Sequence, residues 1–375
     1  MPWISCSGKS FVEPFPSVET LNRKAVNLET LGEDSLSFYE KAAKLGHEKS
    51  ILKTAQLYLE KLNVDAAVKW FRRSKDPEAM NALGIMHLNG VGVARSDKLA
   101  FDYFHKAAHL GNYEAQYSLA ELYYRGQGVS QDYVLAAKWF RESAFYLGRA
   151  QLMMGNISAD GQGVPASQEQ SIFWWRQAAE IGVQDAQYNL AITLLNIPGD
   201  HSESFRLFKR LSAENDSSAM NSLGNMFFYG DTVKQNYDLA FEYYKKSALL
   251  GNMNGQFNLA MSYGSGLGVD QDLHSAKEWC LKAANQGLVD AVNQMGVICD
   301  AGLGTPVDRK QAFQWYLKAA KRGFASAQFN VGLSYHKGLG VERDETIALH
   351  WYRLAAAGGI NEENVLVSGS RKSPC

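Results

Sequence analysis

The sequence predicts an all-α protein, a right-handed α/α superhelical solenoid of about nine helix-turn-helix repeats. One observation is a phrase that recurs at intervals close to 36 residues, as in AMNALGIMHLNGVGV from Ala79 and AQFNVGLSYHKGLGV from Ala327. The others are a glycine pair near the end of most phrases and an aromatic pair in the segment that follows. A period of this length is typical of stacked helical hairpins, each of which contacts only its neighbours.

The phrase divides residues 50–360 into nine units. We call the first residue of each phrase its anchor, and we expect a first helix, helix A, around the anchor and a second, helix B, after the glycine pair. The anchors are Ser50, Ala79, Ala115, Ala150, Ala186, Ala219, Gly255, Ala291 and Ala327.

Helix A carries a small residue five positions after each anchor, such as Ala120 or Gly155. A small residue there lets two helices approach closely. Helix A then runs into pairs such as Gly126 and Gly128, which can take the positive φ that ends a helix. No predicted strand precedes these pairs and the third glycine of a dinucleotide-binding loop is missing, so they indicate turns.

Helix B carries an aromatic pair in most units, as at Trp139 and Phe140. Seven of the eight tryptophans occupy this place, which favours a structural role in the core between helices. In the unit that begins at Gly255, Trp279 is followed by Cys280 instead of a second ring.

The combination of A-x-x-x-L-G-x-x-Y-x-x-G-x-G-V, A-x-x-W-Y-x-K-A-A and a closing glycine resembles the Sel-1-like repeat (SLR), a relative of the tetratricopeptide repeat. The resemblance covers roughly residues 50–360. It weakens where LLNIPGDHSES replaces the glycine pair in the unit from Ala186, at Thr232, and in the unit from Ser50, which is seven residues short. We expect irregular stacking there. The resemblance implies a non-enzymatic protein that assembles or activates other machinery.

The two ends are expected to differ from the repeats. Residues 17–49 predict a degenerate capping hairpin, because Phe38, Tyr39 and Gly46 repeat the helix B phrase. Residues 1–16 predict an apolar arm without a useful helix, which either folds back or is recognised by a partner. Residues 361–375 predict a short cap and a mobile tail.

Composition excludes several classes of protein. Lys and Arg total 38 against 39 Asp and Glu, so nucleic acid is not an expected partner. No apolar run is long enough for a transmembrane segment, and the first residues lack a signal-peptide pattern. The four cysteines, Cys6, Cys280, Cys299 and Cys375, form no disulfide framework, which predicts a cytoplasmic protein with Cys280 and Cys299 as buried free thiols. We expect a monomer or weak self-association.

No catalytic residue, metal ligand or cofactor site is predicted. Ser50 and Lys53 have the S-x-x-K spacing but lack the accompanying S-D-N and K-T-G motifs. His105 and His109 lie one helical turn apart without a third ligand. A hydrolytic enzyme centred on Ser50 or on this histidine pair remains an alternative function of a different class.

A solenoid of this kind offers a concave wall lined by helix A. By analogy with tetratricopeptide hairpins, the inward positions lie one before the anchor and two, three, six, nine and ten after it. Asparagine stands two or three after the anchor in six of nine units, with aromatic residues between them. The predicted partner-binding residues are Asn81, Tyr117, Tyr124, Tyr188, Asn189, Asn221, Phe228, Phe257, Asn258, Asn293, Phe329 and Asn330.

An asparagine amide both donates and accepts, so a ladder of asparagines can hold the backbone of an extended peptide. The alternative is that each asparagine hydrogen-bonds the adjacent hairpin. Positive charge on the wall is sparse, which argues against a clamp for acidic peptide termini. The predicted function is therefore a protein-binding adaptor or scaffold, and an immunity-type inhibitor that occludes a toxin is the second possibility.

Overall fold

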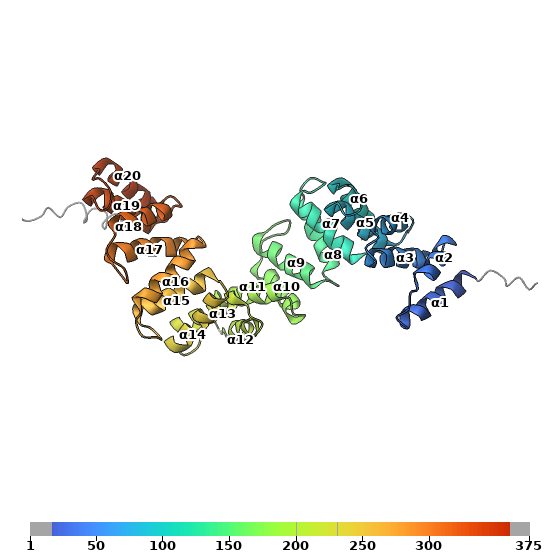
Figure 1. The fold of residues 1–375 in the computed structure, drawn as a ribbon, viewed down its shortest axis with the longest axis horizontal. Helices are drawn as coiled ribbons and strands as arrows, with labels where there is room; N and C mark the ends of the chain where they lie inside the picture. The colour runs from blue at the N-terminus through green and yellow to red at the C-terminus, as the bar shows by residue number, and fades with distance from the viewer. Residues whose placement is uncertain (1–16, 200, 231, 361–375) are drawn as a thin grey trace, which may run out of the picture. The chain divides into compact units, whose positions relative to one another are not determined.

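The computed structural model describes residues 17–199, 201–230 and 232–360, which form twenty α-helices and no β-strand (Figure 1). The helices are α1 (Val18–Thr30), α2 (Leu36–Lys44), α3 (Glu48–Glu60), α4 (Val64–Phe71), α5 (Pro77–Asn89), α6 (Asp97–His109), α7 (Tyr113–Arg125), α8 (Tyr133–Ser143), α9 (Gly148–Asp160), α10 (Gln168–Glu180), α11 (Gln184–Leu195), α12 (Ser202–Ala213), α13 (Ser217–Tyr229), α14 (Tyr237–Leu249), α15 (Met253–Ser265), α16 (Leu273–Asn285), α17 (Val289–Ala301), α18 (Arg309–Ala320), α19 (Ala325–Lys337) and α20 (Glu345–Ala357). The predicted all-α class is confirmed.

The helices follow one another as hairpins, with odd-numbered helices as helix A and even-numbered helices as helix B (Figure 1). The nine predicted units correspond to α3–α20, and α1 with α2 forms a further hairpin before them. From α1 to α10 and from α12 to α20, each helix packs against the next helix in the chain. This succession of neighbour contacts is the solenoid arrangement that the repeat period predicts.

The chain divides into two compact units, residues 1–186 and 187–375. The boundary falls in α11, the first helix of the repeat whose loop lacks the glycine pair. The first unit has a core around Phe104, Leu119 and Phe140. In the second unit, one core cluster includes Met295 and Tyr316.

The small residue five positions after the anchor receives the second ring of the helix B pair. A Cβ on Gly84 would lie 2.6 Å from the Phe104 ring, and one on Gly332 would lie 2.7 Å from the Tyr352 ring. Where alanine holds this position in α3, α7 and α11, the second ring is a phenylalanine that shares its core cluster: Phe71, Phe140 and Phe208. The close approach predicted from the small residues is therefore confirmed, and every repeat with alanine at this position and a ring at the second place uses phenylalanine.

The first ring is buried in some pairs, as at Trp70 and Trp139, but departs from the predicted core role in others. Trp279, Trp315 and Trp351 are only half-buried, whereas the second residues Tyr316 and Tyr352 are buried. A lysine three residues later covers the outer side of two of these rings, with Lys282 Nζ 3.6 Å from the Trp279 centroid and Lys318 Nζ 5.1 Å from that of Trp315. A cation–π contact is favourable at the protein surface, where the ammonium group keeps part of its hydration.

The two glycines of the loop between helix A and helix B have different structural roles. The first, such as Gly126, ends helix A with φ of 67° in the left-handed region, as predicted. The second, Gly128, also has positive φ, and a Cβ on it would overlap the carbonyl group of Asp97, the first residue of helix B in the preceding repeat. The second glycine therefore sets the spacing between neighbouring hairpins, which the sequence analysis did not predict.

Several sequence predictions lie outside the described residues. These are the apolar arm at 1–16, the cap and tail at 361–375, and the cysteines Cys6 and Cys375. The capping role of residues 17–49 stays a prediction. Among the described helices, none combines the length and the apolar character that crossing a bilayer requires.

Candidate functional site on helix A

The twelve predicted partner-binding residues, which we call the helix A face, are all half-buried. None lies in the closed core and none is fully exposed, so each combines a fixed position with some contact to solvent. Three belong to the first unit, on α5 and α7, and nine to the second unit, on α11, α13, α15, α17 and α19. The second unit therefore holds most of the candidate site.

Four asparagines of the helix A face are joined in two pairs between neighbouring repeats. Asn258 Nδ2 donates to Asn221 Oδ1 over 2.8 Å, and Asn330 Nδ2 donates to Asn293 Oδ1 over 3.2 Å. Hydrogen bonding to the adjacent hairpin, the alternative considered from the sequence, thus holds for these residues. Each pair uses one amide oxygen as acceptor and leaves the oxygen of the donating asparagine outside the pair, available to a ligand N–H group.

A fifth asparagine, Asn225, extends the first pair, and the sequence analysis did not select it. Its Oδ1 accepts from Asn258 Nδ2 at 3.3 Å and from the Tyr244 hydroxyl at 2.8 Å. Asn225 lies six positions after its anchor, which is one of the inward positions, so that spacing was the available signal. Asn81 differs from the rest because its buried Oδ1 has no hydrogen-bond partner among the described residues.

Asparagine and aromatic residues alternate along the second unit with a period of two repeats. In α11, α15 and α19 an aromatic residue stands two after the anchor and asparagine three after it, whereas in α13 and α17 asparagine stands two after it. The aromatic–asparagine pairs are Tyr188–Asn189, Phe257–Asn258 and Phe329–Asn330. The alternation explains the bonding, because position three of one repeat meets position two of the repeat before it.

Aromatic residues of the helix A face pack against the second rings of helix B in edge-on or tilted contacts. Tyr117 and Phe140 have centroids 5.5 Å apart, and Phe329 lies 5.5 Å from Tyr352. Burial, together with the nearby Glu121 carboxylate, raises the pKa of Tyr117 to about 12, so its hydroxyl stays protonated. The Tyr124 hydroxyl donates to Gln162 Oε1 of the next repeat at 2.7 Å.

Three basic residues at inward positions of the first unit are engaged by carboxylates of the chain. Lys53 Nζ lies 2.5 Å from Glu29 Oε1, and Arg125 lies 3.1 Å from Glu121. Arg149 pairs with Glu114 and also lies over the Tyr117 ring, 4.4 Å from its centroid. These pairs oppose a clamp for acidic peptide termini and favour recognition through amides and rings.

The serine and the histidine pair that were considered as catalytic candidates make hydrogen bonds to other residues of the chain. The Ser50 side chain is fully buried, and its hydroxyl donates to Asn22 Oδ1 at 3.1 Å and lies 2.7 Å from Nδ1 of His47, the N-cap residue of α3. His109 Nδ1 lies 2.8 Å from the His105 carbonyl oxygen, which fits a ring N–H donor. Among the described residues, no cluster of three or more His, Cys, Asp and Glu side chains could hold a metal ion.

Buried and half-buried glutamines next to the anchors were also missed from the sequence. Gln151 Nε2 donates to the Ala144 carbonyl oxygen at 2.9 Å, and Gln328 Nε2 donates to that of Ala320 at 3.4 Å. Each bond ties helix A to the C-terminal end of helix B in the preceding repeat. The repeated Ala-Gln dipeptide was the signal for this contact.

The architecture matches a described repeat along most of the chain. The sequence model of the Sel1 repeat matches residues 33–47, 56–76, 77–112, 114–144, 148–183, 184–216, 217–252, 254–288, 289–324 and 325–360. The chain belongs to the Sel1 repeat family. The first two matches are short, which agrees with the weaker pattern seen before Ala79.

Two solved structures illustrate the range of similarity to this chain. The crystal structure of c5321, described as a protective antigen present in uropathogenic Escherichia coli strains and displaying an SLR fold, is 25% identical with a TM-score of 0.68 over 95% of this chain and 91% of that one. An immunity protein of Pseudomonas aeruginosa, Pa5087, is 16% identical over 80% of this chain and 89% of that one, with a TM-score of 0.29, which carries no argument for an immunity role.

Two curated relatives match shorter stretches of the Sel1 repeats. The rat DAP3-binding cell death enhancer 1 is 26% identical over 164 residues, which is 43% of this chain and 32% of that protein. Chitin synthase regulatory factor 3 of Schizosaccharomyces pombe is 26% identical over 199 residues, which is 48% of this chain and 21% of that protein. The matched stretches thus span about a third and about a fifth of the lengths of these relatives.

Proposed function

We propose that this Sel1 repeat protein is a non-enzymatic adaptor or scaffold that binds an extended segment of a partner protein on the helix A face of its second unit. The observation that carries the proposal is the alternation of half-buried amides and rings at two adjacent positions of five successive A helices. Rings supply area at little cost in side-chain entropy, and amides with spare donors and acceptors satisfy the backbone of an extended chain.

Two further observations support a binding role over a chemical one. The Ser50 hydroxyl is enclosed and hydrogen-bonded, so a substrate has no direct access to it. Two curated relatives with Sel1 repeats carry names that refer to binding or regulating another protein. The free, buried thiols of Cys280 and Cys299 support a reducing compartment such as the cytoplasm.

The test is a selection of short peptides from a displayed random library on the whole protein, followed by fluorescence titration of the selected peptides. We expect peptides of micromolar affinity, and at least tenfold weaker binding to the Phe257→Ala, Phe329→Ala variant, because about 1.4 kcal/mol or more of contact energy is lost. The thermal unfolding of the variant is measured in parallel to show that it is folded.

The matched control is Leu250→Ala, which removes an exposed apolar side chain that lies at the C-terminal end of α14 and outside the helix A face. This variant is expected to bind the selected peptides as the original protein does. Equal binding by the double phenylalanine variant, in folded form, would rule out the helix A face as the binding surface.

A further inference from the structure

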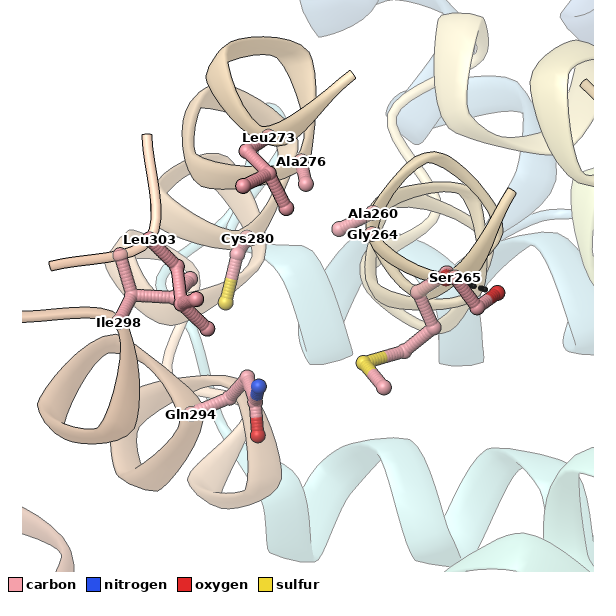
Figure 2. Close-up of a pocket in the computed structure, with 10 residues that line it drawn as sticks. Ala260, Gly264, Ser265, Leu273, Ala276, Cys280, Gln294, Ile298 and Leu303 are labelled. Atoms are coloured by element: carbon pink, nitrogen blue, oxygen red, sulfur yellow. Dashed lines mark hydrogen bonds between the residues drawn. The ribbon is translucent and has the colours of Figure 1, made fainter. Parts of the chain in front are cut away.

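The second unit contains an apolar pocket of about 180 Å³ between the repeat of α15 and α16 and the repeat of α17 and α18. Figure 2 shows Ala260 and Gly264 on one side of it, Ala276 and Cys280 on another, and Gln294 on a third. Leu273, Ile298, Leu303, Met261 and Ser265 complete the lining.

The pocket exists because two bulky side chains are missing from this repeat. Cys280 stands where the other repeats place the second ring of helix B, and Gly264 stands nine after the anchor, where α7 and α13 carry Tyr124 and Phe228. In those repeats the ring at position nine and the second ring are neighbours, with Phe228 and Tyr244 centroids 6.4 Å apart. Both rings are absent from the repeat of α15 and α16, so the space that they fill in the other repeats stays open as a pocket.

The walls of the pocket are suited to an uncharged ring. Ala276, Cys280 and Ile298 are buried and form its inner part, whereas Met261, 42% exposed, and Ser265 lie toward solvent. Burial raises the pKa of the Cys280 thiol to about 12, so the inner part carries no charge near neutral pH. An enclosed apolar cavity of about 150 Å³ binds benzene, so a volume of about 180 Å³ is large enough for one phenyl ring.

The pocket adjoins the helix A face. Met261 and Gly264 lie six and nine after their anchor, and Gln294 lies three after its own, all of them inward positions. A residue inserted here would leave its backbone beside Asn258 and Asn293, which occupy the neighbouring positions of the same two helices. The surroundings thus offer an apolar anchor site next to amides that can hold a peptide backbone.

We propose that this pocket receives the phenyl ring of a phenylalanine in the partner segment. The proposal rests on the proposed function for the presence of a peptide on the helix A face. The choice of ring comes from the chain itself: the three other repeats with alanine five after the anchor all fill the corresponding space with Phe71, Phe140 or Phe208. The repeat that contains the pocket is of the same kind, because Ala260 stands five after its anchor.

The test uses N-acetyl-phenylalaninamide as a probe and follows its binding to the whole protein by NMR titration and calorimetry. We expect saturable binding with a dissociation constant on the order of 1 mM, as is usual for a ligand of this size. Cys280→Phe, which supplies the missing ring, is expected to abolish probe binding while leaving thermal stability equal or higher. Cys280→Ala keeps the pocket open and is the matched control, with binding within about twofold of the original.

A second variant that fills the pocket keeps the test decisive if the first variant does not fold. Gly264→Phe places a ring from the opposite wall, and a Cβ at this position would make only an ordinary contact of 3.7 Å with Ala276. Loss of probe binding in both folded variants supports the pocket. The absence of saturable binding to the original protein, or binding that Cys280→Phe leaves unchanged, would overturn the proposal.

The peptides selected on the helix A face separate this inference from the proposed function. If they bind the original protein and lose at least tenfold in affinity on Cys280→Phe or on replacement of one phenylalanine in the peptide, the pocket is their anchor site. If they bind with no sensitivity to either change, the pocket inference fails and the proposed function stands. If the probe binds but no peptide is selected, the proposed function fails and takes with it the assignment of a partner residue to the pocket.

Discussion

At the scale of single residues, the asparagines of the helix A face do two things at once. Asn258 and Asn221 close the gap between two repeats with a hydrogen bond of 2.8 Å, yet both stay half-buried rather than buried. An amide bonded on one side is held in one orientation, so its remaining donor or acceptor meets a ligand without a large loss of side-chain entropy. The structural and binding explanations for these residues are therefore compatible.

The Asn258–Asn221 bond is testable by a double-mutant cycle. We expect Asn258→Ala to lower the free energy of unfolding by about 1–2 kcal/mol, because Asn221 and Asn225 then lose the same donor. The further effect of Asn221→Ala in that background is expected to be smaller than in the original protein, with a coupling of about 0.5–1.5 kcal/mol. Urea unfolding followed by circular dichroism measures the four proteins, and strictly additive effects would contradict the bond.

Glu48 gives the first unit a dependence on pH. Burial acts to raise the pKa of Glu48, but the Lys75 backbone N–H and the Ser74 hydroxyl, which donates at 2.8 Å, outweigh it and hold the pKa below its ordinary value. Because the folded pKa is lowered, the stabilisation is complete above the unfolded pKa and is lost as pH falls through the folded one.

We therefore expect Glu48→Gln to destabilise the first unit by about 1 kcal/mol at pH 7, after discounting for partial exposure to solvent. The difference from the original protein should shrink as pH falls below the ordinary glutamate range, since both side chains are then neutral. Denaturant unfolding at a series of pH values measures this, and a difference that stays constant down to acid pH would refute the assigned ion–dipole bonds.

At the scale of elements, the loop between helix A and helix B is as much a contact between repeats as a turn. The second glycine lies against the backbone at the start of the preceding helix B, as Gly268 does at Tyr237. The N-cap residue of the following helix B closes the same loop, and the Asp272 N–H donates to the Tyr263 carbonyl oxygen at 2.9 Å. Any side chain at the second glycine must push two hairpins apart.

Two glycines with positive φ in the second unit allow the cost of backbone strain to be measured separately from the cost of a steric clash. Gly268→Ala is expected to cost about 3 kcal/mol or more, because its Cβ overlaps the Tyr237 carbonyl group in addition to the cost of φ near +76°. Gly251→Ala, where φ is +88° and no atom lies within 4 Å, is expected to cost only about 1 kcal/mol. Chemical denaturation measures both, and equal losses would remove the spacer role from Gly268.

At the scale of the whole molecule, each of the two compact units is a series of contacts between neighbouring helices. Within each unit, a helix packs against the helices next to it in the chain. Stability in such an array is approximately a sum of repeat and interface contributions, so damage is expected to stay local.

Hydrogen exchange followed by mass spectrometry tests this locality on the whole protein. Gly268→Ala is expected to raise exchange in α13–α18 and leave α3–α8 unchanged, whereas Gly128→Ala, which crowds the Asp97 carbonyl group, is expected to do the reverse. Faster exchange throughout both units after either change would mean that the chain unfolds as one cooperative body.

The period of the sequence by itself determined the helical hairpins, the glycine turns and the positions of the helix A face, because these depend on side-chain size and spacing within one repeat. Only the tertiary structure decided that Asn258 binds Asn221, that Gly128 rests on the preceding helix B, and that Cys280 leaves an open pocket. These features depend on the register between neighbouring hairpins, about 36 residues apart in the chain, and a pattern read within one repeat does not contain that register.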